Sequence, residues 1–158
     1  MTDPEAQLRE YAGRLADGIE AALPGWVTGQ VERVATAQSV VLTADVRAAT
    51  EAAAAEARAA VGGQIRKLLE QDPDDQRTTP LALLRGAVRY PTAVLRDAGA
   101  APVGRDRFAQ QSFPDDLYDL SPATFADIDP GLAEPGLEWG AAKAFVHKRR
   151  HAPRKSAD

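Results

Sequence analysis

The sequence of 158 residues lacks cysteine altogether, so it can form no disulfide bond, no thiolate metal site and no cysteine nucleophile. Histidine occurs only twice, which leaves almost nothing from which a histidine-based catalytic triad or zinc centre could be built. No stretch approaches the roughly 18 apolar residues of a membrane span, and the opening "MTDPEAQLRE" lacks the basic and apolar regions of a signal peptide. We therefore expect a cytoplasmic protein with no cofactor and no membrane contact.

The charges are present in ordinary numbers, but they are separated along the chain. Residues 1–76 carry thirteen acidic side chains against seven basic ones, and residues 77–107 carry six arginines against two aspartates. The stretch from Asp115 to Glu138 then holds seven carboxylates and no base, and Lys143 to Lys155 holds six bases and no acid. This alternation allows pairing between segments of the chain, and it equally allows binding to an outside polyanion.

Apolar residues three and four apart predict an all-α fold. A first helix should begin after Asp3 and stop at the breaker "PGW", Pro24 to Trp26. A longer helix should run from Val31 to Gln71, either unbroken or broken at Gly62-Gly63. Its β-branched stretch "SVVLT" would also suit a short strand. The alanine run lets helices approach closely, so the two helices should form a long antiparallel hairpin.

Prolines divide the second half of the chain into short pieces. A helix should begin at Pro80, be interrupted at Pro91 and restart to end at Gly99. Short helices should then wrap over the hairpin, followed by a basic terminal helix, "EPGLEWGAAKAFVHKRR". We expect one domain over residues 1–151 and a disordered basic tail over residues 152–158.

Four stretches, "RYPTAVLRDAG", "FPDD", "SPATFADIDP" and "EPGLEWGAAKA", resemble a group of small, uncharacterised actinobacterial proteins. The resemblance covers Arg89 to about Arg150. It implies an actinobacterial source, with which the strong use of alanine and arginine agrees. It implies no activity.

Two short motifs match enzymes of known chemistry. The tripeptide "GGQ" at residues 62–64 occurs in translation release factors, but its flanks here are helical, so a helix break or a close helix contact is the better interpretation. The stretch "DDLYD" at residues 115–119 has the DDxxD spacing with which isoprenoid synthases hold Mg²⁺. It follows a proline, which favours acids that cap a helix start.

His147 and His151 are four residues apart, a spacing that two metal ligands on one helix can have. The bases between them, Lys148 to Arg150, oppose a divalent cation, and no nearby carboxylate completes a site. We therefore expect a solvated basic helix end and no metal.

An arginine stripe is the strongest candidate for binding. If the chain stays roughly helical across Pro91, then Arg85, Arg89 and Arg96 lie within about 40° of one another. These arginines could bind phosphates, with Lys148, Arg149 and Arg150 extending the surface, or they could pair with the acidic residues of Asp115 to Glu138.

Aromatic residues make up 6% of the chain and gather after Arg107. They should either complete the core or, where exposed, form a partner surface. This candidate surface consists of Phe113, Tyr118, Phe125, Trp139 and Phe145. Because no catalytic residues can be assembled, we expect a non-enzymatic protein that binds a protein partner or itself. The alternative is association with RNA, DNA or the ribosome through the arginine stripe.

Overall fold

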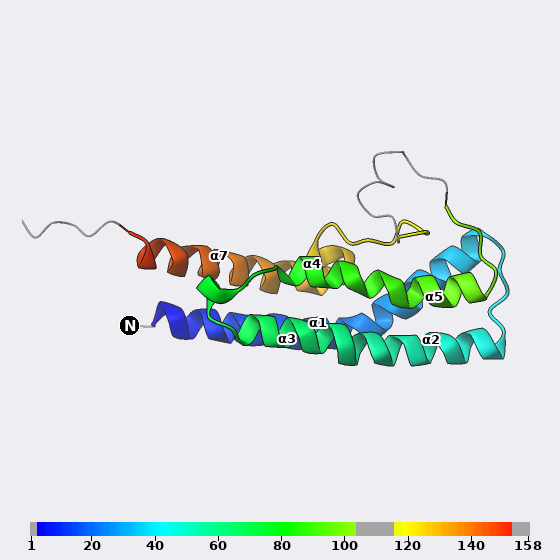
Figure 1. The fold of residues 1–158 in the computed structure, drawn as a ribbon, viewed down its shortest axis with the longest axis horizontal. Coiled ribbons are helices and arrows are strands. Elements are labelled where there is room, and N and C mark those ends of the chain that lie inside the picture. The colour runs from blue at the N-terminus through cyan, green and yellow to red at the C-terminus, as the bar shows by residue number, and fades with distance from the viewer. Residues whose placement is uncertain (1–2, 104–115, 153–158) are drawn as a thin grey trace, which may run out of the picture.

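A computed structural model describes residues 3–103 and 116–152 (Figure 1). Within these residues the chain forms helices and turns and no strand, as the sequence predicts. The α-helices are α1 (Pro4–Ala37), α2 (Ala44–Ala57), α3 (Gly63–Glu70), α4 (Pro80–Arg85), α5 (Arg89–Asp97) and α7 (Ala133–Arg150). The shorter helices are the π-helical η1 (Arg58–Gly62) and the 3₁₀ turns η2 (Pro73–Asp75), η3 (Gly86–Val88), η4 (Phe125–Asp127) and η5 (Pro130–Leu132).

Helix α1 begins at a proline after Asp3, whose carboxylate accepts the N–H of Glu5 at 3.1 Å. The predicted stop at Pro24 is wrong, because α1 continues through this residue to Ala37. A proline inside a helix costs roughly 3 kcal/mol. The apolar stripe continues beyond Pro24 with Trp26 and Val27, both buried, so burial on each side offsets that cost. Figure 1 shows α1 changing direction along its length, as a proline inside a helix allows.

The hairpin turn lies at residues 38–43, inside the segment predicted as one long helix. Ser39 adopts the left-handed conformation with φ of 56°, and the N–H of Val40 donates to Ala35 O at 2.8 Å. This is a Schellman cap, which ends α1. "SVVLT" is therefore neither helix nor strand, and Val31 belongs to the first helix.

The second limb of the hairpin consists of α2, η1 and α3, which follow one another without a turn. Thr43 begins it by accepting the N–H of Val46 at 3.2 Å. Gly62 lies where this limb contacts α1: a Cβ there would come within 2.9 Å of Cγ of Glu20. The close helix contact predicted for "GGQ" is thus present, and the predicted break takes the form of a π-helical turn.

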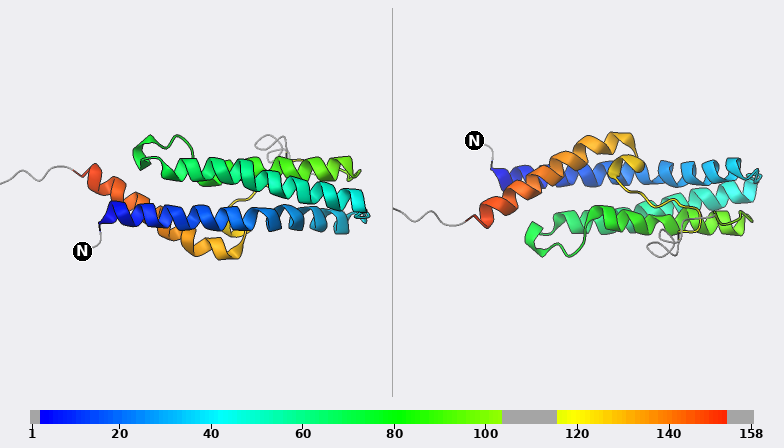
Figure 2. Two further views of the ribbon diagram at one scale, coloured as in Figure 1. Left: turned by 90° about the horizontal axis from the view of Figure 1, so that it is seen from below. Right: turned by 90° about the horizontal axis from the view of Figure 1, so that it is seen from above.

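Helices α4 and α5 run back beside the second limb (Figures 1 and 2). The predicted interruption lies a few residues before Pro91, at the 3₁₀ turn η3. Pro91 has no N–H to donate to Ala87 O, which explains why the α-helical pattern changes there. Gly99, with φ of 87°, ends α5 in a second Schellman cap.

The last helix, α7, packs against the side of α1 away from α2 and crosses it obliquely (Figure 2). It buries Trp139 and Val146, and the segment that leads to it buries Tyr118, Ile128 and Leu132. The wrap predicted from the prolines is therefore present among the described residues. Its acids bind backbone more than they bind bases: Asp116 accepts the N–H groups of Leu120 and Ser121 at 2.7 Å each. None of the described helices is both long and apolar enough to cross a membrane.

The bundle has two different ends (Figure 1). We call the end formed by the turn at residues 38–43 and by residues 98–101 the tip. We call the end where the start of α1, η2 and the last turns of α7 meet the junction.

Candidate functional site

The junction contains a cleft of about 290 Å³. Its apolar wall includes Leu8 and Trp139, and its polar wall includes Gln76, Lys143 and Arg150. These side chains come from α1, from α7 and from the linker after α3, so the cleft exists only when α7 is docked. Chemistry-bearing residues from three distant parts of the sequence therefore meet here.

Lys143 is an ionisable group of this cleft that has no charged partner among the described residues. Its Nζ donates a hydrogen bond to Oε1 of Gln76 at 2.8 Å and lies 5.1 Å from the ring centre of Trp139. Burial lowers the pKa of the Lys143 ammonium. A neutral amide and an aromatic face hold the ammonium in place, and no carboxylate of the described residues forms a salt bridge with it.

Arg150 links the three segments at the junction. Its Nε donates to Glu5 Oε1 at 2.8 Å, and its Nη1 donates to Asp72 Oδ1 at 2.6 Å and to Asp74 Oδ2 at 3.0 Å. Hydrogen bonds from Arg150 lower the pKa of both aspartates, and those carboxylates raise the pKa of the guanidinium. The expectation of a free basic helix end is therefore wrong at Arg150.

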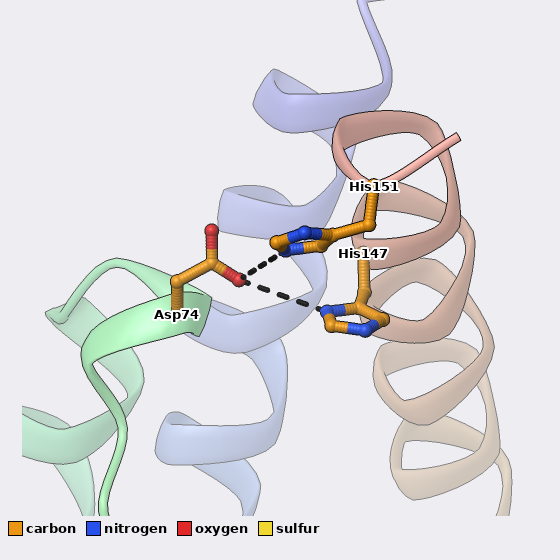
Figure 3. A group of neighbouring side chains, drawn as sticks. All are labelled: Asp74, His147 and His151. Atoms are coloured by element: carbon orange, nitrogen blue, oxygen red, sulfur yellow. Dashed lines mark hydrogen bonds and ion pairs between the residues drawn. The ribbon is translucent and has the colours of Figure 1, made fainter. Parts of the chain in front are cut away.

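Asp74 also faces both histidines of the chain (Figure 3). Its Oδ1 lies 3.7 Å from Nδ1 of His147 and 3.4 Å from Nε2 of His151. The two imidazole rings project side by side from α7, with centres 4.3 Å apart. The sequence argument that no carboxylate accompanies the pair is wrong, because Asp74 comes from η2, more than seventy residues away in sequence.

The outer face of α7 is apolar at its centre, although its large side chains are mostly exposed. Leu137 is 75% exposed and Phe145 is 54% exposed, with the exposed Ala141 and Ala144 between them. The stripe is bounded by Glu134 near the start of the helix and by Lys148 near its end, both exposed. At 100° per residue these six positions span an arc of about 100°. We call them the outer face of α7.

The predicted aromatic surface is divided by the structure. Tyr118 and Trp139 are buried in the core, Phe125 is half-buried against Gly136, and Phe145 is exposed. Phe113 lies outside the described residues.

The predicted arginine stripe is also divided. Arg85 is half-buried and its Nε donates to Pro122 O at 3.2 Å. Arg89 and Arg96 are exposed on α5; Arg89 donates to the hydroxyl of Tyr90 at 2.9 Å. Among the described residues, neither Arg89 nor Arg96 forms an ion pair with the acidic stretch. Lys148 and Arg149 are exposed on a different helix, α7, whereas Arg89 and Arg96 lie on α5.

The "DDLYD" stretch does not form a metal-binding helix face in its described part. Residues 116–119 form a turn, in which Asp116 is buried as a backbone cap and Asp119 is exposed with φ of 56°. Asp115 lies outside the described residues. The carboxylate of Asp116 thus accepts two backbone N–H groups, which explains why this acid can be buried.

Sequence reasoning missed the contribution of the linker after α3, "DPDDQ" at residues 72–76. It supplies Asp72, Asp74 and Gln76 to the junction. The available signal was its density of acids, which matches the basic end of α7 in sign, but the pairing of the two segments depends on how α7 docks.

The fold and the junction define a class: a small all-α bundle whose first and last helices are linked by charged side chains. Comparisons with protein-family models, curated proteins and solved structures found no match to this chain.

Proposed function

We propose that this chain is a cytoplasmic, non-enzymatic interaction protein that binds another protein chain through the outer face of α7. The observation that carries the proposal is the exposure of Leu137 and Phe145 on one side of α7 while other large apolar side chains of the same helix are buried. An exposed apolar stripe with a charged residue at each end has the pattern of a helix-to-helix contact.

The occupant that suits this face best is α7 of a second copy. The face is symmetric about Ala141, because Leu137 and Phe145 lie four residues to either side of it, and Glu134 and Lys148 lie seven residues to either side. In an antiparallel pair of α7 helices related by a two-fold axis at Ala141, Leu137 of each copy meets Phe145 of the other. Glu134 of each copy then meets Lys148 of the other, so both charge pairs are complementary.

Small side chains at the centre of the face support this arrangement. Ala141 and Ala144 allow two helix backbones to approach closely, while the large side chains fill the space on either side. Within the described part of the chain, neither Glu134 nor Lys148 has an ion-pair partner that would compete. A face one helix wide is smaller than a standard interface of about 1,600 Å², so we expect a reversible dimer that dissociates on dilution.

Charge reversal tests the antiparallel pairing directly. Glu134→Lys and Lys148→Glu should each weaken the dimer several-fold at low salt, because each places like charges opposite one another. The double variant Glu134→Lys/Lys148→Glu should restore wild-type association, because it exchanges the charges within a complementary pair. Sedimentation equilibrium over a wide range of protein concentration measures the dimer dissociation constant of the wild type, of the two single variants and of the double variant.

Loss of the apolar contact gives the second arm of the test. Leu137→Ala and Phe145→Ala should weaken the dimer while leaving the melting temperature of the dilute monomer unchanged, since both side chains are exposed. A chain that stays monomeric up to millimolar concentration, or a dimer that none of these substitutions affects, would overturn the self-pairing. Capture of an unlike protein by a monomeric chain would assign the face to another partner.

Nucleic-acid binding is a second candidate, which the exposure of Arg89 and Arg96 favours. These side chains lie seven residues apart on α5, on one face, and make no ion pair among the described residues. Arg89→Glu/Arg96→Glu should then abolish retention on a polyanion column at low salt, and wild-type retention should fall steeply as salt rises. Equal retention of wild type and variant would exclude this surface. Arg85 is left unchanged because its contact with Pro122 makes it structural.

A further inference from the structure

We propose that Asp74, His147 and His151 form a binding site for a divalent transition-metal ion of the zinc class. Three potential ligand atoms, one from each residue, lie within 4.8 Å of one another. In a tetrahedral site with metal-ligand bonds of about 2.0 to 2.1 Å, the ligand atoms are roughly 3.3 Å apart. The separations of 3.4 and 3.7 Å between Oδ1 of Asp74 and the two imidazole nitrogens are close to that value.

The arrangement of the rings supports a shared ion over two separate contacts. One carboxylate oxygen faces a nitrogen of each imidazole, and the rings lie next to each other on consecutive turns of α7 (Figure 3). The ring centres are 4.3 Å apart, so the two imidazoles approach Asp74 from the same side. A single divalent ion bound by the two imidazole nitrogens and the carboxylate oxygen would use all three of these groups at once.

The local charge also favours a cation. The positive charge of Arg150 is surrounded by three carboxylates, those of Glu5, Asp72 and Asp74. Arg150 Nη1 donates to Oδ2 of Asp74, so the other carboxylate oxygen, Oδ1, is the one that faces the two imidazoles. Of the other bases near the pair, Arg149 lies about 160° around the helix from both histidines, and Lys148 lies about 100° from His147 and about 60° from His151, at 100° per residue.

The ligand set determines which ions the site should accept. Two imidazole nitrogens and one carboxylate oxygen suit Zn²⁺, Ni²⁺, Co²⁺ and Cu²⁺, whereas Mg²⁺ and Ca²⁺ prefer oxygen ligands alone. All three side chains are exposed, so solvent molecules can complete the coordination. A bound ion would connect the linker after α3 to the last turn of α7 and so hold the junction closed.

Titration calorimetry of the tag-free, chelator-treated full chain with Zn²⁺ tests the site. We expect one ion per chain at protein concentrations below those that favour self-association. His147→Ala, His151→Ala and Asp74→Asn should each weaken binding by at least about tenfold, as expected for the loss of a ligand. Mg²⁺ should not compete.

The matched control is Asp72→Asn. Like Asp74→Asn, it removes a charged partner of Arg150, but it leaves the three proposed ligands in place. It should bind Zn²⁺ with nearly wild-type affinity, and Zn²⁺ should raise its melting temperature as it does for the wild type. Asp74→Asn should show little such rise.

Three outcomes would overturn the proposal. These are the absence of Zn²⁺ binding by the wild type up to millimolar metal, an unchanged affinity in Asp74→Asn, and an equal loss of affinity in Asp72→Asn and Asp74→Asn. The second outcome would show that the histidine pair binds alone, and the third that only the Arg150 contacts matter.

Discussion

The two ends of the bundle are held together by different forces. At the tip, two Schellman caps end α1 and α5, and the side chain of Gln38 binds both backbone groups of Ala101 at 2.7 Å each. At the junction, a guanidinium, two carboxylates and an ammonium line a cleft, and a third carboxylate and two imidazoles lie next to the guanidinium. The tip is closed by neutral hydrogen bonds whose strength depends little on salt or pH, whereas the contacts of the junction depend on both.

This difference determines which end of the bundle can respond to a change in salt concentration, pH or metal concentration. Neutral caps fix the turn that defines the hairpin, so the fold does not depend on ionic conditions there. The charged contacts are confined to the place where α7 docks, and the proposed metal ligands lie among them. The following experiments compare the two ends, from the largest expected effect to the smallest.

Removal of the chain after Val103 should have the largest effect, because it deletes α7 and its buried contacts with α1. Trp139 and Val146 would no longer cover the junction half of α1, so buried apolar side chains of α1 such as Leu8 would be exposed to water. We expect loss of cooperative unfolding, or aggregation, in a thermal melt followed by circular dichroism. A truncated chain that melts as sharply and at the same temperature as the full chain would show that α7 is dispensable.

Leu95→Ala should cost about 2 to 5 kcal/mol, since it creates a cavity in a core position near the tip. The side chain is 1% exposed. Denaturant unfolding at low and high salt measures the free energy of unfolding. Because the loss is one of apolar packing, the difference from wild type should be the same at both salt concentrations, and a strong salt dependence would contradict the neutral character of the tip.

Gln38→Ala should cost about 1 kcal/mol, because it removes two hydrogen bonds to Ala101 whose partners can turn to water. Amide hydrogen exchange at Ala101 should accelerate, since its N–H now donates to Oε1 of Gln38. An unchanged exchange rate would show that this contact does not hold the tip in solution. Gln30→Ala provides the control, because the half-buried Gln30 also accepts two hydrogen bonds, both from Arg33 and both within α1.

Arg150→Gln should lower the melting temperature by the smallest amount, because its ion pairs are exposed to solvent, and the difference should shrink as salt rises. The pKa values of Asp72 and Asp74 are lowered in the folded chain, so the folded state binds fewer protons than the unfolded state as the pH falls. Stability from these contacts is thus present above about pH 4, the ordinary pKa of aspartate, and is lost as the pH falls below it.

The acid dependence therefore separates the two ends. Between pH 6 and about pH 3, wild type should lose its advantage over Arg150→Gln, while the difference between wild type and Leu95→Ala should persist. A constant gap between wild type and Arg150→Gln would show that the ion pairs contribute nothing.

The sequence was sufficient for the parts of the fold that depend on local patterns. The all-α class and the hairpin follow from apolar spacing and from helix starts such as Asp3, and the wrap follows from the prolines of the second half. It failed at Pro24, because the burial of Trp26 and Val27 is a tertiary effect that no local rule for proline contains.

The candidate site was harder to predict for the same reason. The spacing of His147 and His151 gave two of the three proposed metal ligands, but the third ligand comes from η2 and reaches them only through the docking of α7. Exposure was equally invisible in the sequence. Trp139 and Phe145 are both aromatic residues of α7, yet one is buried and the other is 54% exposed, because they lie on different sides of the helix.

The contact between Glu5 and Arg150 brings the first and last described helices together, 145 residues apart in sequence. Because the start of α1 lies beside the end of α7, the described chain could begin at another residue and still place its helices in the same order around the bundle. A circular permutant that begins in the turn at residues 40–43, with the two original ends joined, would retain every described helix. It would give up mainly the cap at Ser39 and would make the junction, now held by side chains alone, a covalent connection.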